Sequence, residues 1–427
     1  MPRSPSTRRG HSDAVTIRRF LHQIVWGVNA IRRRDPMSTT TFARVFGARH
    51  RRAWDPSTTP RRVVIVRSDE IGDTVGTLTL LAAMRAQWPK ATIHLVAKPG
   101  PATIFHATRT IDRLIPWYPI TEGSALRRQV LTARQAVRRF RFRRYDLAVL
   151  PRWDFDDTPV RYLAMASRAR SIVGFAPVPE REPVWFGDQA QLMTDIIPRG
   201  DKALLSVQQL ERVADRLGVV WYRPTEPVGT ELFDANDLRA AAALAALSQT
   251  SSVVVGVGIG ARNAKRQWPV EEVAETMAGL SENGSLTVLV LGGDVDTTRA
   301  RELVGLLQAR GISARDLTGR LSLSQSAAAI SLCGLFLGND SGLQHIASSL
   351  DIPSLVVSCH PASGSPWSDN APERFGPWST RSALLQPDIP AEGCTDECIA
   401  NQPHCIRAVH ATDAVIAARH LLQGSVA

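Results

Sequence analysis

The sequence predicts an α/β protein made of two doubly wound, Rossmann-like domains that face each other across a cleft. Three observations lead to this fold class. Short apolar runs alternate with helical patterns from residue 62, and the alternation restarts at residue 251. Each half also carries a loop of polar residues at a point where a strand gives way to a helix. Such alternation implies parallel sheets that are covered by helices on both faces.

The elements of the first half follow from apolar periodicity. The expected strands cover residues 63–66, 92–96, 111–115 and 147–150. The expected helices cover residues 74–87, 126–142 and 203–217. The alternation becomes unclear between Pro177 and Pro227, where long helices are expected to close the first domain.

The second half repeats the same order. Its expected strands cover residues 253–257, 286–291, 334–337 and 354–358. Its expected helices cover residues 270–280, 298–309 and 343–350. We therefore expect a basic extension over 1–60, a first domain over 61–230 and a second domain over 231–427. It is left open whether the C-terminal tail packs back on the first domain.

Composition separates the extension from the body. Hydrophobic residues make up 44% and charged residues 21%, which is ordinary for a globular protein. No apolar run approaches the roughly 20 residues that span a bilayer, and no signal peptide is evident. Five cysteines in 427 residues fit a reducing compartment. The net charge is +11, and residues 1–60 carry +9 of it.

Inside the extension, apolar residues recur at helical spacing beside arginines. The apolar stripe contains Ile17, Phe20, Leu21, Ile24, Val25, Val28 and Ile31, and the flanking arginines are Arg18, Arg19, Arg32, Arg33 and Arg34. A basic amphipathic helix of this type can bind an anionic membrane surface. A helix packed on the body, a mobile tail and an organelle transit peptide are the alternatives.

A second basic segment follows in the helix expected at 126–142. It is rich in arginine, but aromatic residues are sparse beside it, which argues against a stacking platform for nucleic acid. The expected partner of this helix is an anionic lipid or a phosphorylated sugar, and a solvated helix face is the alternative. No nucleic-acid partner is therefore expected.

The most informative stretch runs from Gly338 to Ala347. It reads as a buried strand, a tight turn and a helix that opens at Ser341 or Gly342. Free backbone N–H groups and the positive end of such a helix form a site for phosphate. Asp340 lies in the turn, and His345 lies one helical turn after Ser341 on the same face. His345 is expected either to contact phosphate or to hold the turn.

A similar loop, residues 68–74, follows the first strand. Asp73 lies beside the expected helix start, where it can act as a general base or as a helix cap. Gly72 and Thr74 flank it and are expected to line the substrate site.

Two further loops carry candidate ligand groups. Residues 257–269 contain small residues that allow close approach and a basic pair, Lys265 and Arg266, that can neutralise a diphosphate. A solvated turn is the alternative. After the strand at 286–291, Asp294 or Asp296 can accept hydrogen bonds from sugar hydroxyls, or they can cap a helix.

Three cysteines near the C-terminus, Cys394, Cys398 and Cys405, lie close to His404. They lack the second pair of a standard zinc motif. A structural loop is expected, and a metal cluster remains the alternative.

Four groups of these residues together resemble glycosyltransferase family 9, the heptosyltransferases that build the inner core of bacterial lipopolysaccharide. The groups are Ile71-Gly72-Asp73 with Thr77-Leu78, Lys265-Arg266 with Trp268-Pro269, Asn339-Asp340-Ser341-Gly342 with His345, and the cysteine-bearing tail. The resemblance covers about residues 62–420. Departures from the family pattern are Thr79 in place of a proline, the insertion of Gln267 and the 60-residue extension.

The resemblance implies a GT-B fold and an inverting transfer that needs no metal and no cofactor. It implies a nucleotide diphosphate sugar as donor, ADP-heptose by default, and a lipid A-core or other glycan as acceptor. Asp73 would be the base, Lys265 would hold the diphosphate with the N–H groups of Ser341 and Gly342, and Asp340 would orient the sugar or the turn. The enzyme would work in the cytoplasm, at the inner face of the inner membrane.

Three other functions remain as alternatives. A nucleotide-sugar epimerase would convert its substrate without an acceptor, and a binding protein would hold the same ligand without turnover. A dinucleotide-dependent oxidoreductase is disfavoured because the first strand is not followed by Gly-x-Gly-x-x-Gly.

Overall fold

The computed structural model describes residues 51–120, 122–140, 144–153, 159–176, 192–221, 227–245, 253–282 and 285–424. The amphipathic helix expected at residues 17–31 lies outside this range. Among the described residues, no helix is both long enough and apolar enough to cross a membrane.

The first half forms a six-stranded sheet in the order β3-β2-β1-β4-β5-β6. Its strands are β1 (Arg62–Arg67), β2 (Thr92–Ala97), β3 (Arg113–Pro116), β4 (Leu147–Leu150), β5 (Ser171–Phe175) and β6 (Asp195–Ile197). Its helices are α3 (Ile71–Gln87), α4 (Pro99–Ala102), η1 (Thr103–Phe105), α5 (Ala125–Phe140), α6 (Val160–Ala166) and α7 (Ser206–Leu217). The described pairings are parallel, as in β1 with β4, where Val63 lies opposite Leu147.

The second half forms another parallel sheet, in the order β12-β11-β10-β7-β8-β9. Its strands are β7 (Val253–Gly258), β8 (Leu286–Leu291), β9 (Ser313–Asp316), β10 (Leu335–Asn339), β11 (Ser354–Val357) and β12 (Ser382–Leu385). Its helices are η4 (Val228–Leu232), α8 (Ala235–Ala245), η5 (Ala264–Arg266), α9 (Val270–Ser281), η6 (Asp294–Asp296), α10 (Thr297–Ala309), α11 (Leu323–Ser331), α12 (Gly342–Ser349), α13 (Pro372–Phe375), η7 (Cys405–Ala408) and α14 (Ala411–Leu422).

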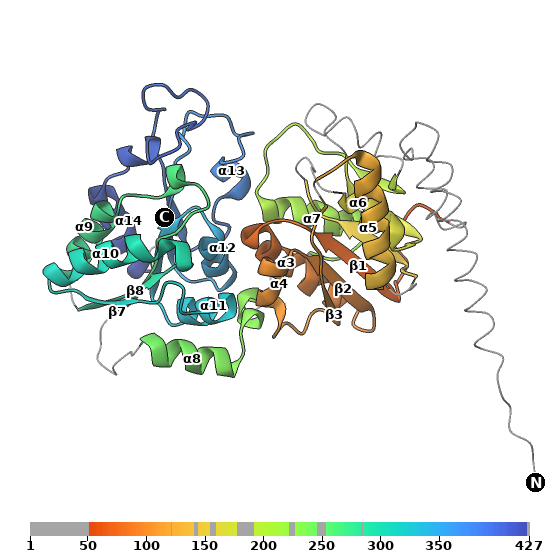
Figure 1. Ribbon diagram of the computed structural model, residues 1–427, viewed down its shortest axis with the longest axis horizontal. Coiled ribbons are helices and arrows are strands. Elements are labelled where there is room, and N and C mark those ends of the chain that lie inside the picture. Colours follow the sequence, from red (N-terminus) through yellow and green to blue (C-terminus); the bar gives the residue numbers. More distant parts are fainter. Residues whose placement is uncertain are drawn as a thin grey trace, which may run out of the picture. The chain divides into compact units, whose positions relative to one another are not determined.

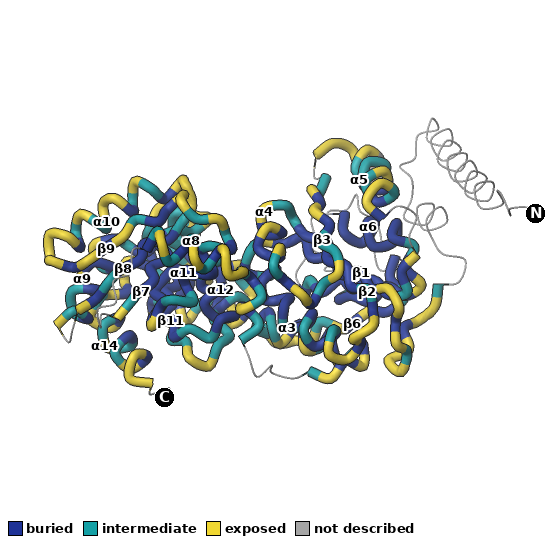
Figure 2. Tube along the Cα trace, turned by 90° about the horizontal axis from the view of Figure 1, so that it is seen from below, coloured by how far each residue is buried: buried dark blue, intermediate teal, exposed yellow. Residues whose placement is uncertain are grey.

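Helices cover both faces of the second sheet (Figures 1 and 2). Helix α9 packs against α10 and α14, whereas α11 packs against α8 and α12. The chain leaves β7 towards β8 but leaves β10 towards β11, so right-handed crossovers place the connecting helices on opposite faces. The strand order reverses between β7 and β10. Ligands of open α/β sheets bind at such a point, outside the carboxyl ends of the strands.

The predicted fold class, two parallel doubly wound sheets, is confirmed. Strands β5, β6, β9 and β12 were not predicted. The short strands β9 and β12 lie at the two edges of the second sheet, so their polar or half-buried residues lack a continuous apolar run. Helix α11 was also missed, because serine and alanine supply most of its buried face.

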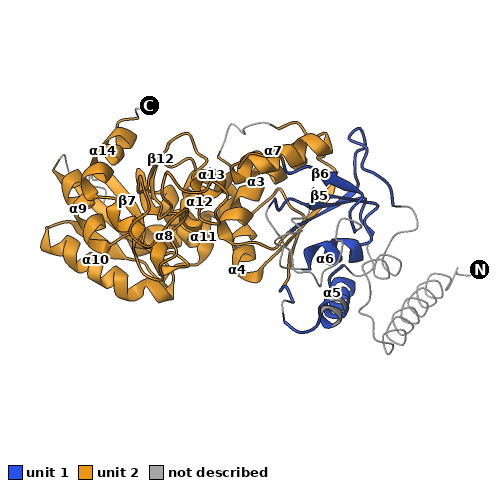
Figure 3. Ribbon diagram, turned by 90° about the horizontal axis from the view of Figure 1, so that it is seen from above, with its two compact units in different colours: residues 1–66, 118–199 blue, residues 67–117, 200–427 orange. Residues whose placement is uncertain are grey.

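The described chain divides into two compact units (Figure 3). One comprises the described parts of Met1–Val66 with Tyr118–Arg199, and the other comprises Arg67–Trp117 with Gly200–Ala427. The second unit therefore contains the whole of α3 together with the whole second sheet. The domain boundaries at 60/61 and 230/231 stay a prediction.

Candidate functional site

Glycines around a buried phenylalanine shape the ends of β7 and β10. A Cβ atom on Gly258 would lie 2.7 Å from the ring of Phe336, and one on Gly338 would lie 2.9 Å from it. These strands therefore accept the fully buried ring of Phe336 only because both positions lack a side chain. The loops that follow the two strands carry four of the predicted ligand residues, namely Lys265, Arg266, Asp340 and Ser341.

Asn339, the last residue of β10, fastens the turn to the loop after β7. Its side-chain Oδ1 accepts a hydrogen bond of 2.8 Å from the backbone N–H of Trp268. Its Nδ2 donates to the carbonyl oxygens of Ile259 and Gly260, at 3.0 and 3.3 Å. Since Asn339 is buried, these bonds satisfy polar groups that would otherwise cost free energy. They set the position of the loop that contains Lys265 and Arg266.

The basic pair meets two different partners. The Nη2 atom of Arg266 lies 2.6 Å from Oδ2 of Asp340, and it also donates to the carbonyl oxygen of Asp340. The Nζ atom of Lys265 donates to the carbonyl oxygen of Cys398 at 2.5 Å. Both residues are thus held in place, and neither is a freely solvated turn residue. An ammonium group has three N–H donors, so this bond leaves donors of Lys265 for an anion.

Asp73 is held from the end of the first strand. Nη2 of Arg67, the last residue of β1, donates to Oδ1 of Asp73 at 2.8 Å. Nε of the same guanidinium lies 2.8 Å from Oδ2 of Asp69. Arg67 is buried, whereas the Asp73 side chain keeps 25% of its surface exposed. Asp73 is the third residue of α3, and the N-cap position belongs to Glu70.

The N-termini of α3 and α12 meet at two glycines. A Cβ atom on Gly72 would lie 2.2 Å from Cδ2 of His345, and one on Gly342 would lie 2.9 Å from Cβ of Ile71. Both helices belong to the same compact unit, and Figure 1 shows them side by side. Because each helix end carries unpaired N–H groups and partial positive charge, this junction favours an anion.

Two buried side chains at this junction have polar atoms without a hydrogen-bond partner among the described residues. They are Nδ1 of His345 and Oδ1 of Asp340. Each such atom costs about 1–3 kcal/mol unless water or a ligand satisfies it. The junction therefore combines a positive electrostatic field with buried polar atoms to which a polar ligand can form hydrogen bonds.

The charge state of His345 depends on its surroundings. Burial lowers its pKa from the ordinary value of 6.5, against the opposing influence of Asp340 and then Asp73. Arg266 lowers it further. The imidazole is therefore neutral at neutral pH, and it can offer one donor and one acceptor to a ligand.

The other predicted substrate residues make hydrogen bonds or close contacts with nearby backbone. Oδ2 of Asp296 accepts a hydrogen bond of 2.9 Å from the N–H of Gly293, and its carboxylate packs against Gly260. The hydroxyl of Thr74 donates to the carbonyl oxygen of Glu70 at 2.7 Å. Asp294 opens η6 beside Gly319. The sugar-binding roles of Asp294 and Asp296 stay a prediction.

Sequence reasoning missed two charged residues of this region. Arg67 lies between the expected strand at 63–66 and the expected loop at 68–74 and was not considered, although an arginine just before a loop with two aspartates was a usable signal. Glu70 lies 2.8 Å from Nζ of Lys98 and 3.2 Å from Nη1 of Arg262, two cations that are distant in sequence. No local pattern reveals these two pairs.

The cysteine-bearing tail also folds into a compact group. The ligand atoms of Cys394, Cys398, His404 and Cys405 all lie within 4.8 Å of one another. All five cysteines of the chain lie in its described part, and none forms a disulfide.

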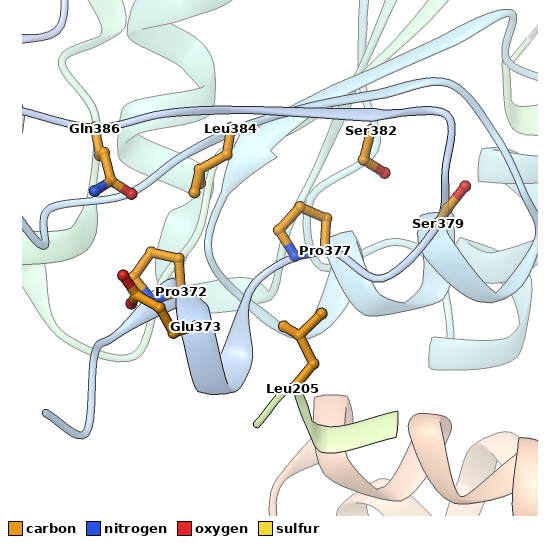
Figure 4. A pocket seen from close by; sticks show the side chains of 8 residues that line it. All are labelled: Leu205, Pro372, Glu373, Pro377, Ser379, Ser382, Leu384 and Gln386. Carbon is orange, nitrogen blue, oxygen red and sulfur yellow. The ribbon is translucent and has the colours of Figure 1, made fainter. Parts of the chain in front are cut away.

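A separate pocket of about 360 Å³ lies in the same compact unit (Figure 4). It is lined by Leu205, Pro372, Glu373, Pro377, Ser379, Ser382, Leu384 and Gln386. None of the predicted site residues lines it, and its only ionisable lining residue is Glu373. We assign no function to it.

Comparison with known proteins supports the resemblance to glycosyltransferase family 9. Residues 218–400 match the family described as glycosyltransferase family 9 (heptosyltransferase). The chain is 24% identical over 304 residues to lipopolysaccharide heptosyltransferase 2 of Salmonella typhimurium. The aligned region covers 69% of this chain and 82% of that protein.

Solved structures show the same fold. A glycosyltransferase family 9 structure from Veillonella parvula superposes with a TM-score of 0.66 and 19% identity, covering 87% of this chain and 100% of that one. The Escherichia coli heptosyltransferase WaaC, solved with ADP, superposes with a TM-score of 0.60 and 16% identity, covering 84% and 99% of the two chains.

The fold is thus the two-domain GT-B architecture, and the protein is a glycosyltransferase. More specifically, it resembles the heptosyltransferases of glycosyltransferase family 9, whose family model matches residues 218–400.

The lowered pKa of His345 predicts a loss of stability in mild acid. An unfolded histidine binds a proton below about pH 6.5, whereas the buried imidazole resists protonation. The unfolding free energy therefore falls as pH drops below about 6.5, by up to about 1.4 kcal/mol per pH unit, until the lowered pKa is reached. Denaturant unfolding at pH 7.5 and 5.5 should show a smaller loss for His345→Gln than for the wild type. Equal losses would contradict this assignment.

Proposed function

We propose that this protein transfers a heptose from ADP-heptose to the core of lipopolysaccharide, with inversion at the anomeric carbon and without a metal in the reaction. The observation that carries the proposal is the meeting of two helix N-termini beside Asp73 and the unsatisfied atoms of Asp340 and His345, with Arg266 of the basic pair bound to Asp340. The heptose and the adenine nucleotide rest on the relatives, which are heptosyltransferases, one of them solved with ADP.

In this proposal, Asp73 is the general base. Its carboxylate takes the proton of the acceptor hydroxyl while the new C–O bond forms at the anomeric carbon and the bond to the diphosphate breaks. Arg67 is a positioning residue, because its buried guanidinium bridges Asp73 and Asp69 and so limits how the carboxylate turns. Gly72 allows the first turn of α3 to approach His345 closely enough for donor and acceptor to meet.

The leaving diphosphate requires positive charge. The N–H groups of Ser341 and Gly342 at the start of α12, together with the remaining donors of Lys265, would supply it. Arg266 acts differently, because it pairs with the carboxylate of Asp340. The ion pair reduces the repulsion between this carboxylate and the phosphates, so Asp340 can lie near the donor sugar. His345, Thr74, Asp294 and Asp296 would complete the donor site.

Asp73→Asn tests the base directly. The amide keeps the size of the side chain but cannot accept the proton, so turnover should fall by about 10²–10⁴-fold. ADP affinity should remain within a few-fold, as measured by calorimetry. The assay follows transfer from ADP-heptose to a core acceptor that lacks the heptose.

The matched control for this variant is Asp413→Asn. Asp413 is likewise the third residue of its helix, α14, but it is exposed and lies outside the site. The control should retain wild-type turnover. If Asp73→Asn also kept wild-type turnover, Asp73 would not be the base.

We also propose that residues 1–60 bind an anionic membrane surface at the cytoplasmic face of the inner membrane, near a lipid-linked acceptor. The argument is the charge of +9 beside the apolar helical stripe. Deleting residues 1–50, which keeps the buried Trp54 and its hydrogen bond to Asp195 in place, should lower cosedimentation with anionic liposomes and leave turnover on a soluble acceptor largely intact. Replacing Arg32, Arg33 and Arg34 by glutamine should weaken liposome binding with the apolar stripe retained. Unchanged binding of the deletion variant would reject this role.

A further inference from the structure

The segment between β12 and η7 is unusually long for a loop in a compact domain. Residues 386–404 are all described, and they form neither helix nor strand. Loops longer than about 12–15 residues without secondary structure are uncommon unless something fastens them or they serve a function. This segment ends in the hydrophobic core of the second sheet, where Cys398 and Cys405 are 1% and 0% exposed. What holds it there therefore needs a physical explanation.

Three thiols and one imidazole converge at this point. The four ligand atoms lie within 4.8 Å of one another. Nδ1 of His404 lies 3.4 Å from Sγ of Cys394 and 3.7 Å from Sγ of Cys405. A single imidazole nitrogen has one position for a hydrogen bond, so it cannot make a good bond to both sulfurs.

These distances agree with tetrahedral metal coordination. With metal–sulfur bonds of about 2.3 Å and metal–nitrogen bonds of about 2.0–2.1 Å, tetrahedral angles place sulfur about 3.5 Å from nitrogen and about 3.8 Å from another sulfur. The two measured sulfur–nitrogen distances lie on either side of the first value. Three cysteines with one histidine are a known ligand set of structural zinc sites.

We propose that Cys394, Cys398, His404 and Cys405 bind one thiolate-preferring divalent cation, Zn²⁺ or Fe²⁺, as a closed structural site. The expectation from sequence was a structural loop without metal, because spacing alone showed no second ligand pair. The fold brings the ligand atoms of His404 and the three thiols together, which spacing alone could not show. Four protein ligands leave no open position, so this ion takes no part in sugar transfer.

The position of the site gives it a consequence for the nucleotide loop. The carbonyl oxygen of Cys398 accepts the hydrogen bond from Lys265. Cys405 begins η7, and the next residue after η7, Val409, accepts a hydrogen bond of 2.9 Å from Nε1 of Trp268. The cation would therefore fix both segments of the tail that accept hydrogen bonds from residues 265–268. Loss of the metal should loosen Lys265 as well as the tail.

The first test is the metal content of the full chain, purified under reducing conditions without chelator or metal-affinity resin. Elemental mass spectrometry should find about one equivalent of zinc or iron per chain. Because the method measures zinc and iron separately, it also identifies the ion. Cys394→Ser and His404→Ala should each lower this content to about a tenth or less. Cys333→Ala is the matched control, because Cys333 is buried elsewhere and burial raises its pKa to about 12.

A second measurement needs no variant and covers the case in which the substituted chains fail to fold. The wild-type chain, reconstituted with Co²⁺, should show intense visible d–d bands of a tetrahedral ion and thiolate-to-cobalt charge transfer. A wild-type chain that folds, holds no zinc or iron and gives no such bands would overturn the proposal. These readouts are independent of sugar transfer, so failure here leaves the proposed activity untouched, and the reverse also holds.

Discussion

The contact between the first turns of α3 and α12 is the constraint on which the proposed chemistry depends. It requires glycine on both sides, since a Cβ atom at Gly72 would overlap the His345 ring and one at Gly342 would overlap Ile71. This contact brings a carboxylate from the first half of the chain to a helix end from the second half. A base and an anion site must be neighbours if an acceptor is to attack a sugar whose leaving group is a diphosphate.

The surrounding hydrogen bonds serve to keep that contact in one geometry. Arg67 orients Asp73, Asn339 fastens the loop after β7, and Arg266 pairs with Asp340. Lys265 donates a hydrogen bond to the carbonyl oxygen of Cys398 in the C-terminal tail. Each of these residues sits at a strand end or in the loop that follows one. The rigid sheets therefore supply the positions, and the loops supply the chemistry.

The sequence predicted this arrangement in part. Strand–helix alternation predicted both parallel sheets, and the turn at 339–342 predicted the start of α12 at Ser341 or Gly342, because turn chemistry and apolar periodicity are local signals. Local signals could not show that Gly72 contacts His345, or that Lys265 meets Cys398, because these pairs are far apart in the chain. The pairing of Arg67 with Asp73 was also missed, because the expected strand ended at residue 66 and Arg67 was not considered. The edge strands β9 and β12 were missed because a partly solvated strand does not need a continuous apolar run.

The central claim is that the helix junction recognises a diphosphate, and calorimetry with ADP, AMP and adenosine, without added metal, tests it most directly. Charge-assisted hydrogen bonds contribute about 1.5–3 kcal/mol each, so ADP should bind at least about tenfold more tightly than AMP. Lys265→Gln should reduce that difference while leaving adenosine binding unchanged. Equal affinities for ADP and AMP in the wild-type protein would contradict the account, because the second phosphate would then have no partner at this junction.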